Sequence, residues 1–263
     1  MVNTDGDSDK NDIDEFFDDD ENLFEHTIGQ IVNNVVTDVD GNTYNGIWIG
    51  NQLWMKENLR TTRYDDGMNI PMSNTWSNTE PYCYAHGLHQ CNEENSNNIS
   101  IFGYLYNWAA VMRGTNSSND NPSGVQGICP KGWHVPSDTE WEEMINTVKK
   151  QSVYCCDDCI DCKRIAKSLS AKNTWTSCTT DTCAPGYNPS TNNATGFSAL
   201  PAGYCSYGIQ FNDFGKKNTY WSSTEVDDKY GAHNRSINYE YSHVFESLCD
   251  SKNYGYSVRC VRD

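Results

Sequence analysis

Cysteine is the residue that most restricts how this chain can fold. The 263 residues include twelve cysteines, and an even number in loop-rich surroundings is typical of disulfides formed in an oxidising compartment. A cytosolic zinc protein would instead show repeated Cys-x2-Cys pairs of matched spacing. Only Cys156, Cys159 and Cys162 approach that pattern. We therefore expect an exported domain that is cross-linked by disulfides.

The acidic N-terminal segment has a composition unlike that of the rest. Residues 1–25 contain eleven Asp or Glu and one Lys, which is −10 of the total charge of −17. Such a segment cannot bury enough apolar surface to offset its chain entropy. We predict a disordered acidic linker over residues 1–26 and one globular domain over 27–263. Low mean hydropathy, −0.75, predicts a core that depends on large aromatic side chains and disulfides.

Charge and motifs argue against several functions. The chain has no basic patch to neutralise phosphates, so no nucleic-acid partner is expected. No apolar run approaches the roughly 18 residues of a membrane span, and no signal peptide is recognisable. No G-x-S-x-G nucleophile motif occurs. We predict a protein that is not an enzyme and needs no cofactor.

Two stretches have partial metal-site spacing. Residues 5–14 alternate Asp like a calcium loop but lack the glycine and the final acidic ligand. Cys83 to Cys91 reads C-x2-H-x2-H-x-C, which could ligate zinc. We interpret the first as solvated linker and the second as a surface loop closed by a disulfide, and we predict no metal site.

Local patterns predict strands followed by helices. Asp40-Gly41 is a hairpin turn signal within the β-rich stretch 35–59. Tyr44 and Trp48 should occupy one face of the second strand. Ile47 and Ile49 should occupy the other.

Two helices and several short strands are expected further on. An apolar stripe predicts a helix over 102–112, formed by Leu105, Trp108, Ala109 and Met112. Ser137 and Glu140 form a capping box that begins a second helix, whose buried face is Trp141, Met144, Ile145 and Val148. A short helix within 164–175 and strands at 196–204 and 218–225 complete an α+β chain.

Longer motifs resemble one family. They are "VTDVDGNTYNGIWIGNQLWMKENL", "YLYNWAAVM", "CPKGWHVPSDTEWEEMI", "GFSALPAGY", "YWSSTE" and "GYSVRCVRD", in that order. Across roughly 35–263 the chain resembles the Fibrobacter succinogenes major paralogous domain. The resemblance implies a C-type-lectin-like or formylglycine-generating-enzyme-like fold, with two helices packed on short antiparallel sheets and long disulfide-stapled loops.

The same resemblance implies that the last strand is central to the sheet and that Cys129 bonds to Cys260. The other cysteines lie outside the motifs, many of them in an insertion at about 151–185. For these we predict Cys83–Cys91 and Cys205–Cys249 bonds, as two of very many possible pairings.

Residues 226–254 are the expected binding surface. Sixteen of these 29 residues are Asn, Tyr, Ser, Asp or His, the chemistry of antibody loops. The predicted contact residues are Tyr230, His233, Asn234, Arg235, Asn238, Tyr239, Tyr241 and His243. The composition also resembles variable proteins of diversity-generating retroelements. The alternative is a solvent-facing strand pair whose tyrosines merely cover the sheet.

These observations predict an exported binding module for a protein or glycan, on the outer side of the cell surface or outer membrane. The acidic linker would suit a spacer after a lipid anchor in a longer precursor. One alternative is a structural cell-envelope component without a ligand site. The other is an oxidase-like enzyme, because Cys178 and Cys183 are spaced like the paired cysteines of formylglycine-generating enzymes.

Overall fold

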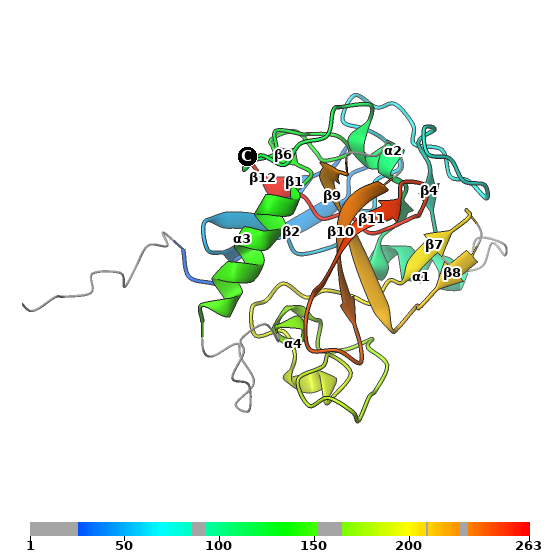
Figure 1. Ribbon diagram of the computed structural model, residues 1–263. Helices are drawn as coiled ribbons and strands as arrows, with labels where there is room; N and C mark the ends of the chain where they lie inside the picture. The colour runs from blue at the N-terminus through cyan, green and yellow to red at the C-terminus, as the bar shows by residue number, and fades with distance from the viewer. Residues whose placement is uncertain (1–25, 86–92, 152–164, 209, 227–230) are drawn as a thin grey trace, which may run out of the picture.

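The computed structural model describes residues 26–85, 93–151, 165–208, 210–226 and 231–263 (Figure 1). The acidic segment 1–25 lies outside them. So do Tyr230, Cys91 and much of the cysteine-rich insertion.

The main sheet joins the two ends of the domain. Its five strands run in the order β1-β2-β3-β12-β6, and they are β1 (Ile31–Thr37), β2 (Thr43–Ile49), β3 (Gln52–Met55), β12 (Val261–Arg262) and β6 (Trp133–His134). Val261 is the register partner of Trp54 on one side and of His134 on the other, both antiparallel. The prediction of a central C-terminal strand is confirmed.

The described residues also form three smaller antiparallel sheets. The largest has the order β11-β10-β9, formed by β11 (Phe245–Ser251), β10 (Gly231–Asn238) and β9 (Lys217–Glu225). The others pair β4 (Cys83–Tyr84) with β5 (Leu105–Tyr106) and β7 (Tyr204–Ser206) with β8 (Gln210–Asn212). The helices are α1 (Glu93–Phe102), α2 (Trp108–Met112), α3 (Asp138–Lys149), α4 (Ala166–Leu169) and the 3-10 turn η2 (Pro189–Thr191). The chain is thus an α+β protein built mostly of small antiparallel sheets.

The first hairpin forms as predicted. The Asp38 carboxylate accepts hydrogen bonds from the backbone N–H groups of Asp40 and Asn42, at 3.0 and 2.9 Å, and from the Tyr44 hydroxyl at 2.6 Å. These bonds hold the turn between β1 and β2. Alternation along β2 then sends Tyr44 into one aromatic cluster and Ile47 into another on the opposite face.

Helix α3 also confirms its sequence signature. Ser137 and Glu140 form both hydrogen bonds of the capping box, and the predicted apolar face is buried. Trp141 of this face packs on Trp54 of β3 with ring centroids 4.4 Å apart. Figure 1 shows α3 lying along one side of the main sheet.

Two predicted elements are shorter than expected. Residues 102–112 do not form one helix, because Gly103 has a φ of +76° and a Cβ there would lie 2.5 Å from the Leu59 carbonyl oxygen. Leu105 therefore belongs to β5, and the helix runs only from Trp108 to Met112. Of the predicted strand 196–204, only Tyr204 is in a strand, whereas 218–225 lies within β9 as predicted.

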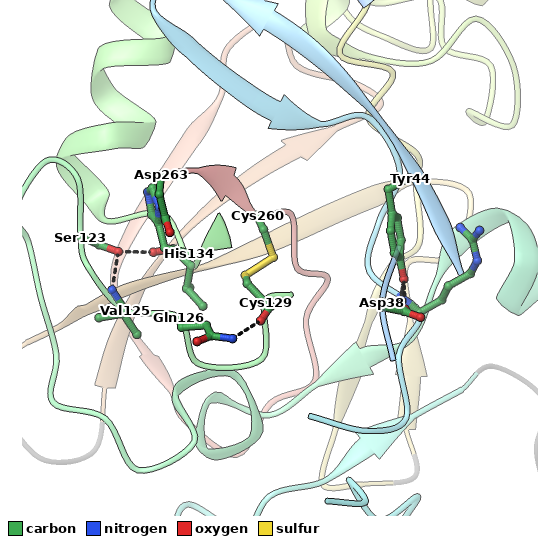
Figure 2. Close-up of a disulfide and its surroundings, with 11 residues drawn as sticks. Asp38, Tyr44, Ser123, Val125, Gln126, Cys129, His134, Cys260 and Asp263 are labelled. Atoms are coloured by element: carbon green, nitrogen blue, oxygen red, sulfur yellow. Dashed lines mark hydrogen bonds and ion pairs between the residues drawn. A yellow bond between two sulfur atoms is a disulfide. The ribbon is translucent and has the colours of Figure 1, made fainter. Parts of the chain in front are cut away.

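The predicted Cys129–Cys260 disulfide is formed, with the Cα atoms 6.0 Å apart (Figure 2). It ties the segment before β6 to the residue before β12. Both sulfurs are fully buried in the larger core cluster.

The other two predicted bonds need correction, because Cys83 and Cys205 carry thiols. The Cys83 side chain is buried in the core and its Sγ donates to the Ile70 carbonyl oxygen at 3.6 Å. Cys205 is buried in a separate cluster on β7, whereas Cys249 lies exposed on β11. Burial raises the pKa of both buried thiols to about 12, which makes them unreactive.

Candidate functional site

The sheet β11-β10-β9 divides the predicted binding residues into two groups. Because β10 is its central strand, Asn234 is 1% exposed and Arg235 is 5% exposed. Neither can belong to an exposed contact surface, so that part of the prediction needs correction. His233, Asn238 and Tyr239 are half-buried.

Of the predicted contact residues that the structure describes, only the last two are exposed. Tyr241 is 48% exposed and His243 is exposed beside it. Both rings pack against Phe245, with centroids 5.3 and 4.1 Å from it. They form a small exposed aromatic cluster, Tyr241/His243/Phe245, beside the start of an edge strand.

A pocket of about 530 Å³ lies elsewhere, at helix α2. It is lined by Asn78, Thr79, Trp108, Ala109, Met112, Gly114, Thr115 and Lys252. Trp108 and Met112 are buried and form the apolar wall of the pocket, whereas Thr79 and Thr115 are exposed at its rim. This volume is in the range of small-molecule sites. We call it the Trp108 pocket.

Buried Asn107 builds one side of this pocket. Its Oδ1 accepts from the backbone N–H of Ala110 at 3.1 Å and so caps α2. Its Nδ2 donates to the carbonyl oxygens of Ser77 and Glu80, at 2.9 and 2.7 Å. The loop that carries Asn78 and Thr79 is thereby held against the helix.

The far end of α2 builds the rim. Arg113 ends the helix in the left-handed region, with a φ of 52°, and Gly114 follows at +74°. Two successive residues with positive φ reverse the chain sharply. This reversal brings Gly114 and Thr115 to the edge of the pocket.

Among the described residues, Lys252 supplies the only charged side chain that lines the Trp108 pocket. Its backbone carbonyl accepts from the N–H of Trp108 at 3.0 Å, and its Nζ lies 4.5 Å from the centre of the indole ring. The Trp108 indole donates to the Ser222 carbonyl oxygen at 3.0 Å, which fixes the ring. Lys252 also forms an ion pair with Glu225 at the end of β9.

One polar atom of the pocket wall lacks a partner. The Asn78 Oδ1 is buried and makes no hydrogen bond within the described part of the chain. A buried acceptor without a donor costs about 1–3 kcal/mol. This oxygen is closed to solvent, so a ligand donor could pair with it only after the Asn78 side chain turned toward the pocket.

The sequence contained some signal for this site. Lys252 lies within the segment predicted to bind a ligand. Trp108 lies in the motif "YLYNWAAVM", but its ring was predicted to be part of the buried stripe of a helix. Asn107 was recognisable as a helix N-cap. Asn78 gave no signal, because only the fold brings its loop to α2.

The alternative catalytic pair does not occur as two thiols. Cys183 is in a disulfide, whereas Cys178 carries a half-buried thiol. Within the described residues, no helix combines the length and apolar character needed to cross a bilayer.

The fold and pocket define a class: a disulfide-linked α+β domain whose C-terminal strand lies inside its main sheet. The chain belongs to the Fibrobacter succinogenes major domain family, whose model matches residues 47–262. This confirms the resemblance found in the sequence motifs. No curated protein and no solved structure is significantly similar to the chain.

Proposed function

We propose that this protein is an exported, non-enzymatic binding module that holds a glycan in the Trp108 pocket. The observation that carries the proposal is the pocket itself, in which an apolar wall of Trp108 and Met112 lies beside the polar side chains of Asn78, Thr79 and Thr115. A sugar ring presents apolar C–H surface together with hydroxyl groups that both donate and accept. That combination suits an aromatic wall with an amide, two threonine hydroxyls and one ammonium around it.

The same proposal includes a C-type-lectin-like fold and export from the cell. A C-type-lectin-like frame is supported by the insertion of β12 between β3 and β6, with α3 alongside. Export is supported by the buried Cys129–Cys260 bond, since such bonds persist in oxidising compartments. If residues 226–254 are diversified by a retroelement, the burial of β10 would confine tolerated changes to exposed positions such as Tyr241 and His243.

A glycan array with the purified chain, followed by calorimetric titration of the best ligand, tests the proposal. Asn78→Ala should weaken binding about 10-fold, since one hydrogen bond contributes about 1–1.5 kcal/mol. Asn74→Ala is the matched control, because Asn74 is exposed in the same loop and does not line the pocket. Equal affinity in all three proteins, or no binding across the array, would exclude this site.

A second candidate function is contact with a protein through the exposed Tyr241/His243/Phe245 cluster. Exposed aromatic side chains beside an edge strand are typical anchors of protein interfaces. Alanine at Tyr241 would abolish this contact and leave glycan binding unchanged. If neither surface binds anything, the structural cell-envelope role becomes the favoured function. Two reactive thiols in a thiol assay, at Cys178 and Cys183, would instead favour the oxidase-like enzyme.

A further inference from the structure

Three side chains that can ligate a metal meet at the N-terminal end of α3. Asp138 is the first residue of α3, His233 lies on β10 and Glu246 lies on β11. One ligand atom from each lies within 4.8 Å of the others. They reach one another because Arg235 and Glu246 are register partners and His233 is two residues before Arg235.

The strand geometry at His233 is irregular. The register of β10 shifts between Ala232 and Asn234 against both neighbouring strands. The extra residues lie in the neighbouring strands, because His233 alone is opposite residues 248–249 of β11 and residues 222–224 of β9. Such bulges are frequent beside functional sites. The His233 Nδ1, opposite these bulges, lies 3.6 Å from Asp138 Oδ2.

That separation suits two ligands of one ion better than a hydrogen bond. Hydrogen bonds between nitrogen and oxygen span about 2.7–3.2 Å. Two ligands of a tetrahedral zinc ion with bonds of about 2.0–2.1 Å lie about 3.3 Å apart. The His233 Nδ1 is buried and has no hydrogen-bond partner within the described part of the chain.

Arg235 occupies the position of a supporting residue. It is 5% exposed, and its two terminal nitrogens lie 2.7 Å from Asp138 Oδ1 and from Glu246 Oε2. Each carboxylate thus gives one oxygen to the guanidinium and keeps the other available. Metal-binding carboxylates are commonly oriented by such an outer partner.

The cluster has a net negative charge even with Arg235 present. Two carboxylates and one guanidinium leave a net charge of −1 when His233 is neutral. Asp138 is only 8% exposed, so little solvent compensates its charge. Glu142 adds further negative charge nearby. A divalent cation would offset this charge.

We propose that Asp138, His233 and Glu246 bind a divalent transition-metal ion of the zinc type, with Arg235 orienting the two carboxylates. The imidazole selects such an ion over calcium or magnesium, which prefer oxygen ligands. Three protein ligands leave a coordination position for water or a ligand group. The Glu246 side chain is 44% exposed, so the ion can enter from solvent.

Titration of the chelator-treated full chain with Zn²⁺, by calorimetry and by elemental analysis after gel filtration, tests the proposal. We expect one ion bound at this site per chain. His233→Ala should weaken Zn²⁺ affinity at least about 100-fold, because loss of a direct ligand costs more affinity than loss of an outer partner. His243→Ala is the matched control, because His243 is exposed in the same segment and should leave binding unchanged. Glu246→Gln removes a ligand from an exposed position with little risk to folding and should also weaken binding.

Cysteine-rich segments could bind zinc too, so two further measurements identify the site. Co²⁺ bound by two carboxylates and an imidazole should show visible d–d bands without thiolate charge-transfer absorption. The double variant His86→Ala/His89→Ala should bind Zn²⁺ like the parent chain. Thiolate absorption, loss of the ion in that double variant, or undiminished affinity in both His233→Ala and Glu246→Gln would overturn the proposal.

Discussion

Removal of the Cys129–Cys260 bond is the sharpest test of how this domain is stabilised. The two residues are 131 positions apart in the sequence. In the chain-entropy model, opening a loop of that length costs about 5 kcal/mol at 25 °C. Cys183, within the spanned segment, is itself disulfide-bonded, and a further cross-link restricts the unfolded chain, so we expect a loss of about 4 kcal/mol.

The variant is Cys129→Ala/Cys260→Ala, compared with the parent in urea at 25 °C without reductant. Tryptophan fluorescence follows unfolding well, because Trp54 and Trp141 are buried against each other. Cys83→Ala is the control, since it removes an equally buried sulfur that closes no loop. Such a truncation should cost about 1 kcal/mol.

The comparison separates loop closure from packing. A double variant that loses about 4 kcal/mol while the control loses about 1 supports the entropic explanation. A double variant that loses no more than twice the control would refute it, because two buried sulfurs would then account for the whole effect. An altered urea dependence in the double variant would report a more expanded unfolded chain.

Two further predictions concern buried cationic groups. Burial lowers the pKa of His134, but Glu140 and Asp263, 2.7 and 2.8 Å away, raise it overall. The charged His134 therefore stabilises the folded state fully below a pH of about 6.5, and this contribution is lost as the pH rises through the folded-state pKa. In thermal unfolding, His134→Gln should lose about 3 kcal/mol of stability at pH 5.5 and less at pH 8.5. Arg259→Met should cost about 3 kcal/mol or more in urea, because it leaves the Phe197 and Ser198 carbonyls unpaired. Arg63→Met, which removes a partly exposed ion pair, should cost under about 1 kcal/mol.

Features set by near neighbours in the sequence were predictable from it. The capping box at Ser137 and the alternation of Tyr44 and Ile47 depend on spacings of a few residues. The helix predicted over 102–112 failed for a long-range reason. The apolar spacing is present in the sequence, but Gly103 must adopt a positive φ because it lies against the Leu59 carbonyl. Leu105 pairs with Tyr84 in a sheet instead of continuing a helix. No local pattern reveals that contact.

The binding residues show the same limit. Composition identified 226–254 as rich in Tyr and Asn, yet composition cannot tell a central strand from an edge strand. Once β10 lies between β9 and β11, Asn234 and Arg235 are buried whatever their chemistry. The cysteines behave similarly, because a bond between positions 131 residues apart follows from the family resemblance and not from spacing.

The end of β9 separates the two proposed sites. Thr224 is buried and its Oγ1 accepts from the backbone N–H of Asp138 at 3.0 Å, on the side of the proposed metal site. The next residue, Glu225, forms an ion pair with Lys252 of the Trp108 pocket. Thr224 and Glu225 thus each contact a different site. The sites also share Ser222, whose Oγ donates to the His233 carbonyl and whose own carbonyl accepts from the Trp108 indole. His233→Ala keeps both backbone acceptors in place. Loss of metal binding in His233→Ala should therefore leave glycan affinity unchanged, and the failure of one proposal would not decide the other.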